Sequence, residues 1–568
     1  MKKLSSLFLI FTILASQILN FSFLESASRR PVKSFNGMVV SSDSLATKVG
    51  IEILKKGGNA VDAAVAVGFA LAVTYPQAGN IGGGGFMVIR MANGETVTID
   101  FREKAPLKAH RDMFLDESGN FAPEKSQIGH LSVGVPGSVA GLILALEKYG
   151  TMSRKEVLNP AIKLAEKGFI VNEGLANAFK NAFEHFKKFP STMKYFSKNG
   201  EPYKAGDKLV QKDLAKVLKL IRDKGRDGFY KGKVADLIVA EMKRGGGLIT
   251  YEDLENYQPV IRKPVIGNYR GYEIISMGPP SSGGVCLIEL LNILENFDLK
   301  KYGFGSSQTI HYLVEAMKRV YADRAEYLGD PDFVQIPLEK LLSKEYAKEI
   351  ANEIDTFYAT PSSKIIRSVS PAFEGVHTTH YSVVDKWGNA VAVTTTINSY
   401  FGSMVVVDGA GFFLNNEMDD FSAKPGAPNQ FGLLGSEANS IQPGKRMLSS
   451  MTPTIVLKNG KPFLVLGSPG GSTIITSVLQ VILNVVDFGM NIQEAVDAPR
   501  IHHQWYPDEI YYERRGLVFD VIENLKKRGH KLVERHGFQG EVQAILIDEN
   551  GVKYGAVDPR GYGLAMGY

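Results

Sequence analysis

The sequence predicts a mixed α/β (α+β) fold in which β-sheets are covered by helices. Two blocks rich in β-branched residues, 86–100 and the chain from 378 onward, are typical of strands separated by turns. Segments with helical character flank these blocks at 44–56, 60–73, 153–257 and 473–488. Sheets flanked in this way bury their apolar faces under helices. The sequence contains no internal repeat.

The first two helices are defined by their ends. Apolar residues at Leu45, Val49 and Ile53 follow a helical spacing that Gly57-Gly58 ends. Asn59 is expected to cap the next helix, which is apolar on nearly every side and therefore expected to be buried. This helix is shorter than the roughly 20 apolar residues that a membrane span requires.

A glycine run, Gly82 to Gly85, leads into an apparent strand, Phe86 to Ile89, and then into a second, Thr96 to Asp100. A phosphate-binding glycine loop opens a helix instead, and the sequence has no Walker pattern. We therefore expect a close-packed loop here and no nucleotide site.

Two later stretches connect the main elements. The glycine- and proline-rich run 278–284 is expected to form a turn before another helix. Lys344 to Ser370 is polar and contains Pro361. We expect it to be an exposed segment that leads to Thr378.

Composition excludes some classes of function. The net charge of +5 is small for 568 residues, whereas a nucleic-acid-binding protein usually has a clustered basic face. The hydrophobic content of 44% is that of an ordinary globular protein. The single cysteine, Cys286, rules out an intramolecular disulfide, and its apolar surroundings predict a buried small hydrophobe.

Residues 1–27 have the pattern of a secretory signal peptide. Lys2-Lys3 precede an apolar stretch from Leu7 to Leu14, and the small residues Ser26-Ala27-Ser28 follow. An uncleaved membrane anchor is the alternative, although polar residues interrupt the apolar zone. We expect cleavage near Ala27 or Ser28 and a protein that is periplasmic or secreted.

Residues 378–396 predict a β-hairpin. A loop of Lys386-Trp387-Gly388, with Gly388 in the left-handed conformation, places Asp385 opposite Asn389. Counting back places Thr378 opposite Thr396, where the two hydroxyls could meet. On spacing alone, an ordinary threonine-rich strand is the simpler interpretation.

Five motifs stand in order along the chain: Asp100-Phe101-Arg102-Glu103, Thr378 to Asp385, Asn415 to Phe421, Leu448-Ser449-Ser450-Met451, and Gly467 to Ser472. In this order they resemble the γ-glutamyltranspeptidase family. The resemblance extends from about Asn36 to Tyr568. It implies the N-terminal-nucleophile hydrolase fold, an αββα sandwich.

The resemblance also implies that the chain cuts itself between His377 and Thr378. With the leader removed, the products would be a large subunit, 28–377, and a small catalytic subunit, 378–568. Thr378 would then be an N-terminal nucleophile. Its own α-amine, with a pKa of roughly 7.7–8.0, would serve as the base.

Further catalytic roles follow from the same resemblance. Thr396 bonds the nucleophile, and Asn398, two residues along the strand and expected on the same face, helps to hold the substrate. Gly470-Gly471 precedes the expected helix 473–488, where free N–H groups suit a developing oxyanion. Without the resemblance, a helix-capping turn is the simpler interpretation of the glycine pair.

A γ-glutamyl group ends in an α-carboxylate and an α-ammonium. Arg102, the only cation of the matched set, suits the carboxylate, together with the hydroxyls of Ser449 and Ser450. Glu417 and Asp420 supply acceptors for the ammonium. The resemblance implies that these residues read the substrate.

Three positions depart from the family pattern. Met447 stands where proline often precedes the next leucine, and Phe431 stands where many bacterial relatives have a lid tyrosine. His377 replaces a polar amide residue before the cut. Because the loop 425–435 is present, we expect a lid without a hydroxyl-mediated latch.

Histidine pairs give little support for a metal site. His377 and His380 are three apart on a strand, which directs them to opposite faces. His502-His503 is not part of a helical HExxH pattern. We expect no metal and no cofactor. No Gly-x-Ser-x-Gly elbow of a serine hydrolase occurs either.

Together these features predict an exported, self-processing enzyme. It would take the γ-glutamyl group of glutathione or a related amide onto Thr378 and pass it to water, an amino acid or a peptide. Its partners would be these small molecules and the two subunits of one precursor, with no nucleic acid. The alternatives are a same-fold enzyme acting on poly-γ-glutamate or cephalosporin side chains, and an unprocessed binding protein without activity.

Overall fold

The hairpin that contains the threonine pair lies at the centre of the fold. In it, β12 (Thr379–Val384) pairs with β13 (Ala390–Thr396), with Thr379 opposite Thr395. Gly388 has a φ of +94°, and the Asp385 N–H donates to Asn389 O. The predicted turn and register are therefore confirmed. The computed structural model describes residues 28–365, 378–424, 430, 434–535, 537 and 539–568.

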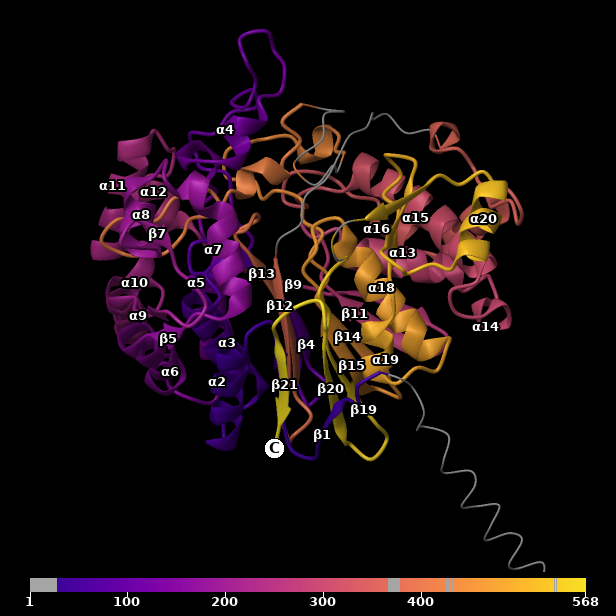
Figure 1. The fold of residues 1–568 in the computed structure, drawn as a ribbon, viewed down its shortest axis with the longest axis horizontal. Coiled ribbons are helices and arrows are strands. Elements are labelled where there is room, and N and C mark those ends of the chain that lie inside the picture. The colour runs from indigo at the N-terminus through magenta and orange to yellow at the C-terminus, as the bar shows by residue number, and fades with distance from the viewer. Residues whose placement is uncertain (1–27, 366–377, 425–429, 431–433, 536, 538) are drawn as a thin grey trace, which may run out of the picture.

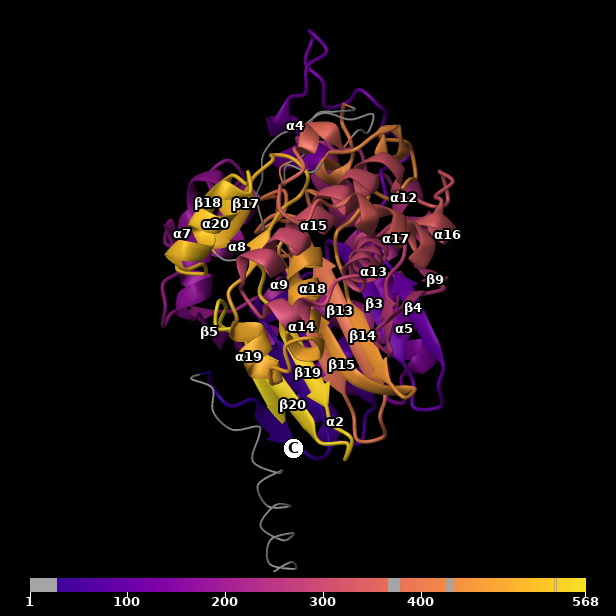
Figure 2. The ribbon, with the colours of Figure 1, turned by 90° about the vertical axis from the view of Figure 1, so that its right-hand side faces the viewer.

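Two seven-stranded antiparallel sheets face each other in the middle of the molecule (Figures 1 and 2). The first has the order β21-β2-β12-β13-β3-β4-β9, and the second has the order β1-β20-β19-β15-β14-β11-β10. Besides the hairpin, the first sheet contains β2 (Met38–Ser41), β3 (Gly84–Arg90), β4 (Thr96–Asp100), β9 (Val260–Arg262) and β21 (Leu564–Gly567). The second contains β1 (Val32–Ser34), β10 (Val265–Tyr269), β11 (Tyr272–Ser276), β14 (Thr454–Lys458), β15 (Lys461–Gly467), β19 (Gln543–Ile547) and β20 (Lys553–Val557).

Alternation along the strands gives the first sheet two buried faces. Phe86 and Val88 of β3 pack between the sheets, whereas Met87 and Ile89 face the helices. The same alternation directs His380 and Ser382 of β12 toward the second sheet, where Ser382 Oγ contacts the backbone of β15 and β19. A strand with two buried faces is apolar almost throughout, as the sequence of β3 is.

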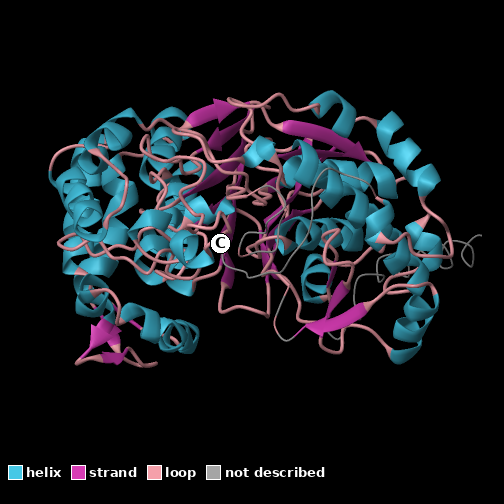
Figure 3. Cartoon of the chain, turned by 90° about the horizontal axis from the view of Figure 1, so that it is seen from above, coloured by secondary structure: helices cyan, strands magenta, loops and turns pink. Residues whose placement is uncertain are grey.

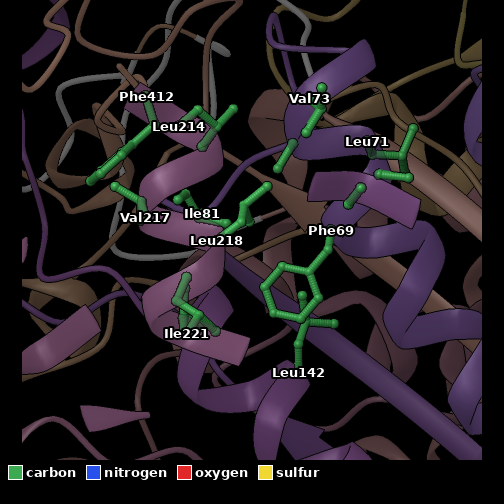
Figure 4. Packing of buried hydrophobic residues seen from close by; sticks show 14 of the residues in the cluster. Phe69, Leu71, Val73, Ile81, Leu142, Leu214, Val217, Leu218, Ile221 and Phe412 are labelled. Atoms are coloured by element: carbon green, nitrogen blue, oxygen red, sulfur yellow. The ribbon is translucent and has the colours of Figure 1, made fainter. Parts of the chain in front are cut away.

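One helical layer covers the first sheet. At its centre is α3, every residue of which is buried, and Figure 4 shows Phe69 of this helix packed close to Leu142 of α5. The Asn59 side chain caps α3, as predicted. This layer consists of α2 (Ser44–Lys55), α3 (Ala60–Thr74), α5 (Ser138–Tyr149), α6 (Arg154–Lys167), α7 (Glu173–Phe186), α8 (Pro190–Phe196), α9 (Lys212–Lys224), α10 (Asp227–Tyr230), α11 (Lys233–Gly245) and α12 (Tyr251–Asn256).

A second helical layer covers the other sheet, so that helices lie on both sides of the strands when the molecule is seen from above (Figure 3). The predicted αββα sandwich is therefore confirmed. This layer contains α13 (Gly283–Leu294), α14 (Leu299–Tyr302), α15 (Ser307–Tyr327), α16 (Leu338–Leu341), α17 (Lys344–Glu353), α18 (Thr473–Val486), α19 (Ile492–Asp497) and α20 (Phe519–Lys527). The remaining elements are α4 (Pro123–Gln127), the 3-10 helices η1 (His130–Ser132), η2 (Ser362–Lys364), η3 (Glu417–Asp420) and η4 (Glu437–Asn439), and the short strands β5 (Phe169–Ile170), β6 (Ser197–Lys198), β7 (Glu201–Pro202), β8 (Lys208–Leu209), β16 (Ile501–His502), β17 (Ile510–Glu513) and β18 (Leu532–Arg535).

The segment 344–370 differs from its prediction. Its first part is α17, in which Ala347, Ile350 and Ala351 are buried in the second helical layer. The many charged residues of this helix lie on its other faces, and they conceal a narrow apolar stripe in the sequence. Residues 366–370 lie outside the described residues. By contrast, Cys286 is buried, as predicted.

The predicted signal peptide, 1–27, also lies outside the described residues. Within the residues that the structure does describe, no helix combines the length and the apolar composition that a bilayer span needs. The export of the chain therefore stays a prediction from the sequence.

The turn of the central hairpin is fixed to α3 by a buried carboxylate. Asp385 is fully buried; its Oδ2 accepts from the Ala60 N–H and the Asn389 amide, and its Oδ1 from the Trp387 and Asn389 N–H groups. Hydrogen bonds to a charged group are worth about 1.5–3 kcal/mol each. We expect Asp385→Ala to lower the free energy of unfolding by at least one such bond, as a lower midpoint of urea unfolding. Lys386→Ala, at the exposed neighbour, is the control and should change the midpoint little; equal effects would contradict the prediction.

Candidate active site

One pocket brings together nine of the ten residues that the sequence analysis assigns to catalysis or substrate binding. It is formed where loops from both sheets meet. The pocket is lined by Arg102, Arg324, Thr378, Thr396, Asn398, Glu417, Asp420, Leu448, Ser449, Ser450, Met451, Gly471 and Ile474. The tenth residue, Gly470, is adjacent to Gly471 in the chain.

The two threonines meet as the hairpin register predicts. Thr378 Oγ1 and Thr396 Oγ1 lie 3.5 Å apart, a distance longer than a typical O–H···O hydrogen bond of about 2.7–2.8 Å. Thr396 Oγ1 also accepts from the Asn398 N–H at 2.8 Å. This backbone contact fixes the Thr396 oxygen next to that of Thr378.

Asn398 reaches the pocket by a different route from the predicted one. Because β13 ends at Thr396, the alternation of a strand does not extend to Asn398. Its φ of +71° is left-handed, a conformation that asparagine tolerates better than most residues. The side-chain amide donates to Asn416 O at 3.0 Å. Non-glycine residues with a left-handed backbone conformation cluster at functional sites, where surrounding contacts hold the strained backbone.

The glycine pair precedes α18. Gly470 and Gly471 have φ values of +144° and +54°, and a Cβ at Gly470 would lie 2.5 Å from Thr473 Oγ1. In the described part of the chain neither N–H donates a backbone hydrogen bond. The capping-turn interpretation also has support, because Thr473 N and Oγ1 both bond to Gly470 O. The two functions are compatible, since one uses the carbonyl and the other the N–H groups.

Arg102 is at the centre of a buried ionic cluster. It follows β4 and is fully buried, and its guanidinium forms ion pairs with Glu417 and Asp420 of the turn 417–420. The same side chain donates to Met447 O and Leu448 O, each at 3.2 Å. Burial opposes the charge of Arg102, but the neighbouring carboxylates outweigh it and raise the pKa of this residue.

Protonation of the acidic residues depends on their burial. Burial raises the pKa of Glu417 to about 7, although Arg102 favours its ionised form. Burial also raises the pKa of Glu103 well above its usual range. Neither carboxylate oxygen of Glu103 has a hydrogen-bond partner among the described residues. Burial therefore favours the neutral form of Glu103, and Glu417 has a pKa close to neutral pH.

The serine pair lies on a loop that a second cation supports. Ser449 and Ser450 are both buried, and Arg324 of α15 donates to Ser450 Oγ at 3.1 Å. Arg324 was not predicted from the sequence, where Arg102 was the only cation of the matched set. A lone arginine on a helix is usually a surface residue. One feature of the sequence could have indicated that Arg324 is buried. It follows the apolar residues Met317 and Tyr321 at helical spacing, and therefore lies on the same face of the helix.

Of the three departures from the family pattern, only Met447 is described. Its side chain packs in a separate apolar cluster, and only its carbonyl contacts Arg102. Any residue supplies a carbonyl, so methionine preserves this contact. Phe431, His377 and most of the loop 425–435 lie outside the described residues.

Two histidines considered from the sequence as metal ligands use their ring nitrogens within the protein. His502 contacts Thr476 and Gln504, and His380 contacts Thr394 and Ser382. One group in the described part of the chain could hold a metal: His311, Glu315 and His530. The Glu315 carboxylate is already paired with Lys318 and Arg319. These two cations oppose a divalent ion, and we assign no metal there.

Comparisons with known proteins agree with the geometry. A sequence model of the family described as Gamma-glutamyltranspeptidase matches residues 46–568. The chain is 56% identical, over 531 residues, to the glutathione hydrolase proenzyme of Escherichia coli (strain K12), in an alignment that covers 93% of this chain and 91% of that protein.

Solved structures give the same result. The chain is similar to a cephalosporin acylase from Bacillus halodurans, with a TM-score of 0.84 and 30% identity, over 96% of this chain and 98% of that one. It is also similar to the γ-glutamyltranspeptidase of Helicobacter pylori, with a TM-score of 0.57 and 52% identity, over 60% of this chain and 96% of that one. With its αββα sandwich of the N-terminal-nucleophile hydrolase type, the chain belongs to the γ-glutamyltranspeptidase family.

Proposed function

We propose that this protein is a self-processing γ-glutamyl hydrolase and transferase that acts on glutathione and related amides. The observation that carries the proposal is the shared pocket: a threonine pair lies in the same cavity as a buried ionic cluster of Arg102, Glu417 and Asp420. The first can attack an amide, and the second can hold the charged end of a γ-glutamyl group.

The chemistry begins with the chain itself. Thr378 Oγ1 attacks the His377 carbonyl carbon, the His377–Thr378 amide bond breaks, and the Thr378 nitrogen takes the proton as the acyl group passes to the oxygen. Water hydrolyses this ester, which frees both the Thr378 hydroxyl and its α-amine, and the amine then serves as base for the hydroxyl. Thr378 Oγ1 attacks the γ-carbonyl of the substrate, and the N–H groups of Gly470 and Gly471 face the oxygen that becomes negative. The C–N bond breaks, and the leaving amine takes the proton. Water, an amino acid or a peptide amine then attacks the γ-glutamyl ester and restores Thr378.

The charged end of the substrate defines its class. Glu417 and Asp420 accept from the α-ammonium, and Ser449 and Ser450 donate to the α-carboxylate, which Arg102 also attracts. These groups lie in the same pocket as Thr378, so a short chain such as that of a γ-glutamyl group can connect the two parts. An ordinary amide without a zwitterionic end would make neither the ammonium contacts nor the carboxylate contacts.

The alternatives receive less support. A cephalosporin acylase is among the similar structures, but its identity to this chain is 30%, against 56% for the glutathione hydrolase proenzyme. Poly-γ-glutamate also ends in γ-glutamyl groups. However, the lid that we expect from the sequence would favour small substrates over this polymer. A binding protein without activity has no use for a positioned threonine pair.

The same proposal divides the chain. Residues 1–27 serve as a signal peptide for export to the periplasm or the medium, 28–377 form the large subunit, and 378–568 form the small one. Both subunits supply the pocket, since Arg102 precedes the cut and Glu417 follows it.

Self-processing is tested at the nucleophile. We expect the wild-type protein to run as two bands on a denaturing gel, and N-terminal sequencing of the smaller band should begin Thr-Thr-His-Tyr. Thr378→Ala lacks the attacking oxygen and should run as one band. Thr378→Ser keeps an oxygen and is the control, which should still split. Cleavage of the Ala variant between residues 377 and 378 would exclude Thr378 as the agent.

The role of Thr396 is tested by removing only its hydroxyl. Thr396→Val keeps the strand preference but leaves both Thr378 and the Asn398 N–H without their partner. Losing a neutral hydrogen bond costs about 0.5–1.5 kcal/mol, and more where a buried group stays unsatisfied. We expect at least several-fold slower processing and turnover of γ-glutamyl-p-nitroanilide, with Thr396→Ser much less affected. Thr395→Val, on the opposite strand face, is the matched control. Wild-type rates in Thr396→Val would assign Thr396 to the strand alone.

The acid side of the pH profile should report Glu417. Its pKa is raised to about 7 by burial, so the group is ionised above that pH and protonated below it. Only the ionised form offers two acceptor oxygens and a negative charge to the substrate ammonium. We therefore expect kcat/KM for γ-glutamyl-p-nitroanilide to fall as the pH drops below about 7, and Glu417→Gln to lose this ionisation while keeping that of the Thr378 amine. Identical profiles for the two proteins would show that Glu417 does not control binding.

A further inference from the structure

Arg324 lies in the pocket, although it is far from the motifs in sequence. It is the fourth residue from the end of α15, its exposed fraction is 4%, and it lines the same cavity as Thr378. Its Nε donates to Ser282 Oγ at 2.9 Å, and its Nη2 donates to Ser450 Oγ at 3.1 Å. Within the described residues, Nη1 has no hydrogen-bond partner.

Arg324 differs from Arg102 in its counter-ions. Arg102 has ion pairs with Glu417 and Asp420, but no carboxylate of the described residues forms an ion pair with Arg324. A buried charge without a counter-ion is costly, and buried charges in proteins are normally paired. Burial disfavours the charged guanidinium and accordingly lowers the pKa of Arg324 from its ordinary value. A ligand anion in the pocket would supply the missing partner.

The charges in the pocket agree with such an anion. The two carboxylates that pair with Arg102 are those assigned to the substrate ammonium. Arg102 therefore already has two anionic partners before the substrate arrives, whereas Arg324 has none. A guanidinium matches a carboxylate in shape as well as in charge, because its N–H groups form a fork.

Arg324 also orients the serine hydroxyls. A serine hydroxyl has one hydrogen to donate. Because Ser450 Oγ accepts from Arg324, its own hydrogen stays available for a ligand. Ser282 Oγ likewise accepts from Arg324 and donates to Ser449 O at 2.7 Å, so the guanidinium supports both residues of the Ser449-Ser450 pair.

We propose that Arg324 is a specificity-determining residue that recognises the α-carboxylate of the γ-glutamyl donor, with Nη1 facing the carboxylate and Ser450 held as its second donor. Arg102 then has two tasks: it orders the acceptors of the ammonium, and it adds attraction for the carboxylate. This inference rests on the proposed γ-glutamyl function of the pocket.

The experiment compares two substrates that differ only in the α-carboxylate. γ-Glutamyl-p-nitroanilide has it, and 4-aminobutyryl-p-nitroanilide lacks it while keeping the amine. For Arg324→Gln we expect kcat/KM toward the first substrate to fall about 10- to 150-fold, the range of one charged hydrogen bond. The loss should lie mainly in KM. The second substrate should be affected less than about threefold, so the ratio of the two kcat/KM values falls.

Arg319→Gln is the matched control. It removes another buried arginine from α15, and Arg319 is paired with Glu315 and does not line the pocket. A structural defect in the helix would slow both substrates alike and leave their ratio unchanged. Processing into two bands and the circular dichroism spectrum establish that each variant is folded.

The outcomes separate the two proposals. If the wild-type protein turns over neither substrate, the proposed function fails. If it is active and folded Arg324→Gln has the wild-type ratio, the inference about Arg324 is overturned. If Arg324→Gln does not accumulate as folded protein, Arg324→Lys decides. Lysine keeps the charge but not the fork, so a ratio several-fold below wild type supports the inference, and an unchanged ratio overturns it.

Discussion

The register of the β12–β13 hairpin is the constraint on which the site depends. Side chains of a strand alternate between faces, so a slip of one residue would exchange the two sides of the sheet. Thr378 and Thr396 would then leave the pocket for the helical layer around α3. The turn prevents this slip, because Gly388 closes it in a left-handed conformation and the Asp385 carboxylate bonds both the turn and the start of α3. A structural carboxylate far from the pocket thus helps to position the nucleophile.

The pocket also depends on buried ion pairs. Arg102, Glu417 and Asp420 come from segments far apart in sequence, and breaking a buried pair of this kind leaves an uncompensated charge. Each partner therefore orders the other two. Burial also raises the pKa of Glu103, which lies 3.7 Å from Arg102 but has no hydrogen-bond donor among the described residues.

The hairpin and the ends of α2 and α3 could be predicted from the sequence, because the signals that define them, glycine turns and an asparagine cap, act over only a few residues. The motifs predicted the members of the pocket. The sequence did not predict Arg324, since its contact with Ser450 spans 126 residues and depends on how α15 packs. Asn398 was assigned to the correct site by incorrect strand reasoning, because the end of β13 is set by the left-handed residues that follow it. In 344–353, a narrow apolar stripe was hidden among charges.

The first sheet contains strands from both sides of position 377. β2 comes from the earlier part of the chain and pairs with β12 and β21 from the later part, and β3, also early, pairs with β13. A cut before Thr378 would therefore produce two polypeptides that share one continuous hydrogen-bonded ladder and one core. Such a pair has no separable docking surface. Dilution would not dissociate it, and subunits from two differently labelled preparations would exchange only after unfolding.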